Sequence, residues 1–574
     1  MTGMGRILVA IALVTASHVS FAARVEFSGS QNKAVLESRM VPSRTSSVST
    51  VSLDLTIPAI EINKDAAGFD SLQVSALSPS PFIGSPEVLG TGSLLVVPQG
   101  HQPELEIVQV EERQLEGVRV RPAQHEWRCG GPKGSFAFNA ALYASDSVYP
   151  QQWANLQEVG SMAGVRLVRV ALNPIRMDMA NQRLLVATRM QLNVHFKQVA
   201  RAAAPQAVSK SVLETLQAST VNGKSLNHFV RSNSRADRMV ILTADSLKET
   251  LKPYVAWKTS RGLQVDVVTL TEAGGSKDAL QKYIKAAYEQ ASVKPTYLLF
   301  VGNKETLPAF KESTASGSAA SDYRMALLAG DDAIPDVFYG RFLADSEAEL
   351  ATQIQRTIEY EKAPGSQPWY RQGMTIASDE GSGPSDQEYA EQIQEALKAG
   401  SYQSVDGFYQ GEMTATSKNI LGALNEGRSW IAYFGHGSGT SWGSVNDKFS
   451  VSTVAEVQNA GKLPVLIDVA CQNASWMNIS KCFGKAWMTE AGETGPRGTV
   501  AYYGGSVNIS WHPPAIMSVG IAKRRFENSV RTIGSSVLAG QLYLLEQMGE
   551  SSQVTDNMKW YNLFGDPSLV VRTN

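Results

Sequence analysis

The sequence is poor in the residues that mark several protein classes. Its 574 residues include three cysteines and seven histidines, and 52 Lys+Arg against 54 Asp+Glu give a formal net charge of -2. Without a basic surplus to neutralise phosphates, nucleic acid is not an expected partner. Three cysteines are also too few for a disulfide framework. The length instead predicts two to four globular domains.

Long apolar runs are missing, except near the amino terminus. There Arg6 precedes an apolar stretch over 7–16 and small residues over 20–23, which is typical of a secretory signal peptide, predicted to span 1–23. A membrane anchor is the alternative, but the run is short for a bilayer. We expect export to the periplasm, the cell surface or the medium, with no transmembrane segment after signal removal. In such a compartment an odd cysteine count leaves a free thiol, which nucleophilic chemistry would explain.

Residues 24–235 have a β-rich pattern. Runs of alternating apolar and polar residues occur at 51–57, 165–172 and 190–196, and they are separated by segments rich in turn residues. This part is predicted to form a β-sandwich-like domain. The polar stretch 231–238 that follows carries three arginines and is typical of an exposed linker.

Beyond the linker, apolar strands alternate with amphipathic helices, which predicts a parallel sheet covered by helices on both faces. Helices are expected over 246–261, 276–291, 346–362, 385–399, 417–425 and 533–548. The pattern restarts near residue 373, so we predict two subdomains, 236–372 and 373–574. In open parallel sheets the chemistry gathers beyond the carboxyl ends of the strands.

One cysteine and one histidine occupy such positions. His436 follows the apolar strand predicted at 430–434, and Cys471 follows the one at 465–470. An interval of 35 residues is enough for one crossover between neighbouring strands, so both side chains can share one edge of the sheet. An imidazole can deprotonate a nearby thiol for attack. A buried structural cysteine and a structural histidine fit the same spacing, which alone leaves both interpretations open.

Three motifs resemble segments of the gingipain family of cysteine peptidases. They are YFGHGSGTSWG at 433–443, DVACQN at 468–473 and YNLFGDPSLV at 561–570. Shorter agreements at 321–322, 337–342 and 353–361 keep the same order, so the resemblance covers about 236–574. It implies a caspase-like α/β peptidase domain of two subdomains, preceded by a β-rich prodomain.

The resemblance also implies roles for individual residues. Cys471 matches the nucleophile, His436 the general base and Glu380 the acid that orients the histidine. Backbone N–H groups of Cys471 and Gly437 would form the oxyanion hole. The glycines flanking His436 permit this close backbone approach.

Substrate preference is implied by two further positions. Asp386 is similar to the aspartate that receives the P1 guanidinium in arginine-specific gingipains, and Trp511 matches the tryptophan of the pocket wall. The loop between Glu380 and Asp386 is shorter than in gingipains, and Asp386 also suits the first turn of a helix. Cleavage after arginine is therefore expected, with lysine left open.

The remaining cysteines and the second histidine of this half have ordinary interpretations. Cys482 resembles a structural cysteine of the family, and Cys129 is expected to pack in the β-rich half. His512 precedes two prolines and is expected in a loop beside the pocket.

By resemblance, the amino-terminal half would cover the active-site edge as an inhibitory prodomain until it is cleaved. Arg231, Arg235 and Arg238 are the candidate processing sites. The chemistry needs no cofactor. Gingipains bind structural calcium, and Asp331–Asp332 lies in an acidic loop, but no ligands are assigned.

The sequence thus predicts an exported cysteine endopeptidase, made as a zymogen, that acts on protein or peptide substrates. Two alternatives stay open. A transpeptidase or maturation protease of the same fold would transfer the acyl group to an amine, and a non-catalytic surface-binding protein would keep only the fold.

Overall fold

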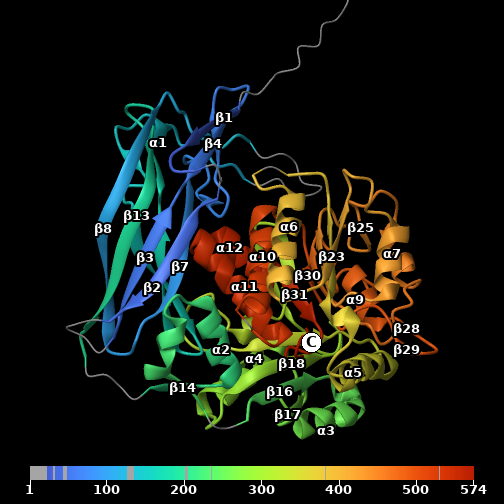
Figure 1. The fold of residues 1–574 in the computed structure, drawn as a ribbon. Helices are drawn as coiled ribbons and strands as arrows, with labels where there is room; N and C mark the ends of the chain where they lie inside the picture. Colours follow the sequence, from blue (N-terminus) through green and yellow to red (C-terminus); the bar gives the residue numbers. More distant parts are fainter. Residues whose placement is uncertain are drawn as a thin grey trace, which may run out of the picture.

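The structure is a computed structural model, in which a β-rich part lies beside a larger α/β part (Figure 1). It describes residues 22–29, 33–42, 48–125, 135–200, 205–233, 236–381, 383–528 and 530–573. Residues 1–21 of the predicted signal segment, Cys129 and Arg235 lie outside the described residues. The last two residues of that segment begin strand β1 (Ala22–Glu26), which pairs with β4 (Ala59–Lys64).

Two of the sheets in the β-rich part face each other across an apolar core. One sheet has the order β10-β11-β7-β6, and the other has the order β2-β3-β13-β12-β9 with β8 also paired to β13. Their strands are β10 (Ala154–Met162), β11 (Val165–Leu172), β7 (Leu89–Val96), β6 (Ser78–Pro79), β2 (Val35–Val41), β3 (Thr50–Thr56), β13 (Arg183–Gln198), β12 (Ile175–Asp178), β9 (Val148–Tyr149) and β8 (His101–Glu116). This arrangement is the predicted sandwich.

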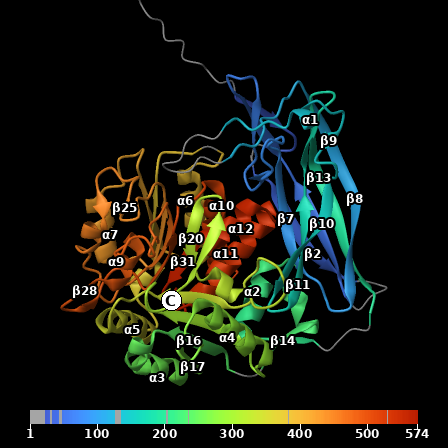
Figure 2. The same ribbon diagram turned by 180° about the vertical axis from the view of Figure 1, so that it is seen from behind.

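Strands β7 and β11 lie between the core of the sandwich and that of the α/β part, and both faces of their sheet are buried. Alternate residues point to opposite faces of a strand. Accordingly Leu95 and Val168 belong to the core of the sandwich, whereas Leu94 and Leu167 belong to the core of the α/β part. The two parts therefore share a buried apolar boundary, which both views show as close packing of β7 against α11 (Ile533–Met548) (Figures 1 and 2).

A ten-stranded sheet forms the centre of the α/β part, with the order β17-β16-β18-β21-β31-β30-β27-β24-β22-β23. Its strands are β17 (Gln264–Thr269), β16 (Arg238–Thr243), β18 (Pro295–Val301), β21 (Phe338–Phe342), β31 (Tyr561–Phe564), β30 (Ala501–Gly505), β27 (Val465–Val469), β24 (Trp430–Phe434), β22 (Gln372–Ala377) and β23 (Ser404–Tyr409). Neighbouring strands are parallel except β30 and β31. Four of its strands, β16, β17, β18 and β21, come from the predicted subdomain 236–372, and the other six begin at Gln372 or later. The two groups meet where β21 pairs with β31.

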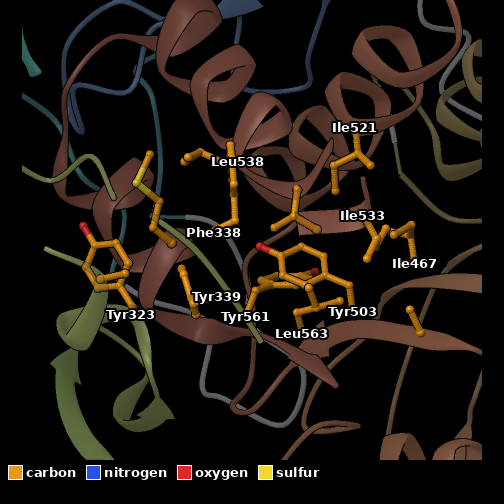
Figure 3. Packing of buried hydrophobic residues seen from close by; sticks show 14 of the residues in the cluster. Tyr323, Phe338, Tyr339, Ile467, Tyr503, Ile521, Ile533, Leu538, Tyr561 and Leu563 are labelled. Atoms are coloured by element: carbon orange, nitrogen blue, oxygen red, sulfur yellow. The ribbon is translucent and has the colours of Figure 1, made fainter. Parts of the chain in front are cut away.

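Helices cover both faces of the sheet. They include α3 (Lys252–Ser260), α4 (Lys277–Gln290), α5 (Glu347–Lys362), α6 (Asp386–Ala399), α7 (Ser417–Glu426) and α10 (His512–Phe526). Figure 3 shows Ile521 of α10 and Leu538 of α11 above Tyr503 and Tyr561 of the sheet, and all four side chains belong to one buried cluster. No helix in the described part of the chain is long and apolar enough to cross a membrane.

Helix α10 corrects one expectation. His512 was expected in a loop because two prolines follow it, but it is the first residue of this 15-residue helix. Proline lacks an amide hydrogen that the first helical turn would leave unpaired, so it is well tolerated there. The two prolines mark the start of a helix, which places His512 beside the candidate site.

Candidate active site

Cys471 and His436 lie at equivalent positions beyond two adjacent parallel strands. Strands β24 and β27 are paired in register, and their last residues, Phe434 and Val469, are partners. His436 comes two residues after the first of these, and Cys471 comes two residues after the second. Both line one pocket, together with Asp386, Gly435, Val469, Ile509, Ser510 and Trp511. The structure thus brings the predicted thiol and imidazole to one edge of the sheet.

The turn that carries Cys471 is held in an uncommon backbone conformation. Cys471 is 5% exposed, and its Sγ lies 4.0 Å from the carbonyl oxygen of Ile509. The next residue, Gln472, has a φ of 61°, which is unusual for a residue other than glycine. Its amide donates to the carbonyl of Val507 at 2.9 Å. Such strain persists only where the surroundings fix the backbone, and it is common at functional sites.

A buried aspartate that the sequence analysis did not single out links the cysteine turn to the histidine loop. Asp468 is fully buried and accepts hydrogen bonds from Trp442 Nε1 at 3.1 Å and Asn473 Nδ2 at 3.0 Å, and another from the Tyr502 hydroxyl. Asn473 in turn accepts from the amide of Gly439 at 3.1 Å. Burial raises the pKa of Asp468 to about 6. A lone acid inside the apolar run 465–470 was the available signal, since a buried carboxylate needs partners.

His436 is oriented by contacts with its ring and its backbone. Its Nε2 lies 3.0 and 3.2 Å from the two carboxylate oxygens of Glu380. Its amide donates to Ser444 Oγ at 2.9 Å, and its carbonyl accepts from the Tyr433 hydroxyl at 2.8 Å. Glu380 follows β22, whose last residue pairs with Phe434. The acid, the imidazole and the thiol therefore follow three neighbouring strands, β22, β24 and β27.

Gly437 lies against the backbone of Cys471. A Cβ at this position would lie 2.4 Å from the carbonyl oxygen of Cys471 and 2.9 Å from Cβ of Ala470. Only glycine fits such a contact. Within the described residues, the Gly437 amide donates no hydrogen bond. This N–H is thus a donor beside the cysteine turn, and its part in an oxyanion hole stays a prediction.

Asp386 is both the first residue of a helix and part of the pocket, so the two interpretations of the sequence are compatible. It opens helix α6 after the N-cap Ser385, is 4% exposed, and accepts a hydrogen bond from Ser378 Oγ at 2.6 Å. Burial raises its pKa to about 7, and the charge of Glu380 adds to the increase. Trp511, the N-cap of α10, forms another wall, and its ring lies 6.3 Å from that of His436 between centroids.

Models of known protein families match the chain over most of its length. The model of peptidase family C25 matches residues 232–572, more than half of the sequence, and the C25 propeptide model matches 28–225. The chain belongs to peptidase family C25. Gingipain R2 of Porphyromonas gingivalis is 28% identical over 447 residues, which are 75% of this chain and 59% of that protein. This C25 chain thus spans about three fifths of the length of that relative.

The solved structures that resemble this C25 chain include two of RgpB. The crystal structure of the Arg-specific cysteine proteinase gingipain R (RgpB) superposes with a TM-score of 0.55 at 31% identity, covering 59% of this chain and 78% of that one. The complex of the pro- and mature domains of Porphyromonas gingivalis RgpB gives 0.55 at 32%, covering 58% and 80%. They confirm the predicted α/β peptidase fold with a β-rich propeptide in front.

The propeptide part of this C25 chain lies next to the candidate site. At this place a cavity of about 300 Å³ lies between the two parts. The peptidase part lines it with Glu380, Gly381, Trp511, His512, Met548 and Gln553, and the propeptide part with Pro79, Ser80, Ile83, Glu87, Arg121, Ala123, Gln124 and His125. The acid beside His436 and the tryptophan of the pocket wall therefore face the propeptide.

Polar contacts fix this arrangement at two places. The Arg169 side chain, 5% exposed, donates to the carbonyls of Glu546 and Gln547 at 2.7 and 2.9 Å, at the end of α11. At the tip of the β10–β11 hairpin, the amides of Ser161 and Ala163 donate to Asp332 and Asp336 at 2.9 and 3.0 Å. Burial lowers the pKa of Arg169 to about 10, so its guanidinium stays charged at neutral pH.

The acidic loop considered for calcium uses its oxygens in this contact. Oδ2 of Asp332 accepts from Ser161 and Oδ1 accepts from the amide of Ile334 at 2.9 Å, so neither is a ready metal ligand. Across the described residues, no group of three His, Cys, Asp or Glu side chains is arranged to hold a metal ion. Structural calcium stays a prediction.

The other predicted residues lie away from the pocket. Cys482 is fully buried before helix α9 (Phe483–Thr489), and burial raises its pKa to about 12, so its thiol is neutral. Arg231 is exposed in β15 (Val230–Ser232). Arg238 instead belongs to β16 inside the sheet, where its Nε donates to Asp266 at 2.6 Å.

Proposed function

We propose that the chain is the zymogen of an exported cysteine endopeptidase that cleaves proteins after basic residues. The observation that carries this proposal is the equivalent position of Cys471 and His436 beyond paired strands, with Glu380 at Nε2 of the imidazole. Membership of family C25 and the likeness to RgpB support the same chemistry.

The geometry supports a thiol mechanism. Glu380 occupies the side of Nε2, so His436 would exchange protons with the thiol through Nδ1. The thiolate of Cys471 attacks the carbonyl carbon of the scissile bond, and the resulting oxyanion is held by the amides of Gly437 and Cys471. His436 then protonates the leaving amine, and water hydrolyses the thioester.

Preference for a basic residue rests on Asp386. Its carboxylate is buried in the pocket that contains the thiol and the imidazole. A buried carboxylate without a cation is costly, as its raised pKa shows, and a guanidinium would supply the missing charge. Arginine offers several donors to a carboxylate, whereas lysine acts as a point charge, so arginine is the favoured substrate.

Inhibition by the propeptide and processing at Arg231 complete the proposal. The propeptide faces Glu380 and Trp511, which restricts access of a substrate.

Arg231 precedes β16 and lies near the amino ends of the parallel strands, whereas Cys471 lies beyond their carboxyl ends. Both views show β14 (Gln206–Val208), the partner of β15, at the opposite end of the molecule from α6 (Figures 1 and 2). Self-cleavage would therefore occur between molecules.

The test is cleavage of a mixed peptide library by the purified mature protein, with Cys471→Ala as the control. Cleavage after arginine or lysine that is lost in the variant is expected. Cleavage after apolar residues would refute the specificity. Transfer of the acyl group to an added amine in preference to water would identify a transpeptidase, and cleavage that persists in Cys471→Ala would refute the mechanism.

A further inference from the structure

Besides Asp386, the candidate pocket contains one more polar side chain, Ser510, to which the proposed chemistry gives no role. Ser510 lies between Ile509, whose carbonyl faces Sγ of Cys471, and Trp511, and all three residues line the pocket. Ser510 is 7% exposed, and its hydroxyl has no hydrogen-bond partner among the residues that the structure describes. Buried hydroxyl groups are rarely left in this state, because desolvation without a partner is costly.

The other groups of the pocket indicate what kind of ligand the Ser510 hydroxyl could bind. One carboxylate oxygen of Asp386 accepts from Ser378, and its other oxygen accepts no hydrogen bond from the described residues. Apart from the cysteine and the histidine, the other lining residues have no side-chain acceptor, since they are apolar residues, a glycine and Trp511, whose indole N–H is a donor only. Asp386 and Ser510 are therefore the polar groups available to a side chain that enters beside Cys471.

A protonated basic side chain is the matching ligand. Guanidinium carries five N–H donors and ammonium three, and neither has an acceptor. One free carboxylate oxygen leaves most of these donors without a partner in a desolvated pocket, and a serine hydroxyl can accept from one more. A site that is built to hydrogen-bond a substrate discriminates strongly against analogues without the donor, because its polar groups then stay unpaired.

We propose that the Ser510 hydroxyl is a specificity-determining group that accepts a hydrogen bond from the basic side chain of the residue before the cleaved bond. This inference rests on the proposed function, since it requires the pocket beside Cys471 to be the one that receives that side chain. It adds a second contact to the one expected from Asp386.

Two substitutions of equal size isolate the hydroxyl. Ser510→Thr keeps it and Ser510→Val removes it, so a loss of packing affects both alike. Each full-length variant is matured with tagged wild-type enzyme, which is then removed, and kcat/KM is measured on peptides with arginine or norleucine before the cleaved bond. Norleucine has an aliphatic side chain without donors. Ser518→Ala is the matched control, because this serine is also buried without a partner among the described residues but lies on α10 and does not line the pocket.

On arginine peptides, Ser510→Val is expected to lose about tenfold in kcat/KM relative to Ser510→Thr, the size typical of a hydrogen bond to a charged group. The two variants should cleave norleucine peptides equally, and Ser518→Ala should match the wild type. Equal activity of both variants on arginine peptides, or equal losses on both peptides, would overturn the role of Ser510 alone. A wild type that cleaves neither these peptides nor a lysine peptide would overturn the proposed function and this inference together.

Discussion

Glu380 contacts Nε2 of His436 with both of its carboxylate oxygens, at 3.0 and 3.2 Å. The contact is half open to solvent, since the Glu380 side chain is 45% exposed. It leaves Nδ1 as the ring nitrogen that can exchange protons with the thiol. We therefore expect Glu380 to act as a positioning residue for His436.

Replacing Glu380 should slow the chemical step without abolishing it. Glu380→Ala is expected to lower kcat on the order of 10- to 100-fold with little change in KM, because the ring loses its orientation but the thiol and the pocket remain. The rate at which iodoacetamide alkylates Cys471 should fall in parallel. Glu391→Ala, on the exposed face of α6, is the matched control. An unchanged alkylation rate in Glu380→Ala would refute the positioning role.

Cleavage after arginine should depend on the ionisation of Asp386. Its pKa is raised to about 7, mainly by burial, so the carboxylate is largely protonated at pH 5.5 and charged at pH 8.5. The kcat/KM for arginine peptides, divided by that for norleucine peptides, should therefore rise about tenfold or more through pH 7. Asp386→Asn should remove this step. A ratio that is flat between pH 5.5 and 8.5 in the wild type would contradict the assignment.

The same pKa predicts an effect on stability. A raised pKa in the folded chain means that the contribution of Asp386 to stability is full below the ordinary value near 3.8 and is lost as pH rises through 7. Asn has no such dependence. The difference in Tm between Asp386→Asn and the wild type should thus shift in favour of the variant from pH 5 to pH 8, as differential scanning calorimetry can measure.

Replacing Gly437 should show whether activity depends on the close contact between its backbone and that of Cys471, and Gly422 of the same domain is the control. Gly437→Ala places a Cβ 2.4 Å from the carbonyl oxygen of Cys471, so the two loops must separate. We expect a fall in kcat of about 100-fold or more, as for the loss of an oxyanion donor. A Cβ at Gly422, in the middle of α7, would instead have no atom of the described residues within 4 Å. Gly422→Ala should keep full activity and gain about 0.5–1 kcal/mol of stability.

The sequence indicated the strand ends that carry the site because buried parallel strands are continuous apolar runs, and the residues after 434 and 469 are the first that can turn outward. It did not indicate the place of β31, since a strand at 561–564 enters the middle of the sheet through contacts with distant segments. Local patterns carry no such information. The network around Asp468 could not be predicted for the same reason. Its donors Trp442 and Tyr502 lie 26 and 34 residues away in the sequence.

Arg169 should control how tightly the propeptide is retained after processing. Arg169→Ala removes charged donors from two carbonyls at the end of α11 and leaves those carbonyls buried, which should cost about 2 to 3 kcal/mol. Size-exclusion chromatography of the processed complex should show the propeptide dissociating at correspondingly higher concentration. Arg189→Ala is the control, because Arg189 pairs with Asp54 of the same β-rich part at its surface. Equal retention in both variants would show that the shared apolar boundary holds the propeptide without help from Arg169.

Processing should require Arg231 and a second molecule. Arg231 is exposed in a three-residue strand, whereas cleavage after Arg238 would have to pull β16 from between β17 and β18. Arg231→Gln combined with Arg235→Gln should therefore block removal of the propeptide at this junction, and Arg238→Gln should not. Because the junction and Cys471 lie at opposite ends of the parallel strands, a Cys471→Ala zymogen should be processed by added wild-type enzyme, at a rate that rises with enzyme concentration. Mass spectrometry of the new amino terminus measures this directly. A processing rate per molecule that stays constant on tenfold dilution of the wild type would mean that the chain cleaves itself, which this arrangement of junction and site does not allow.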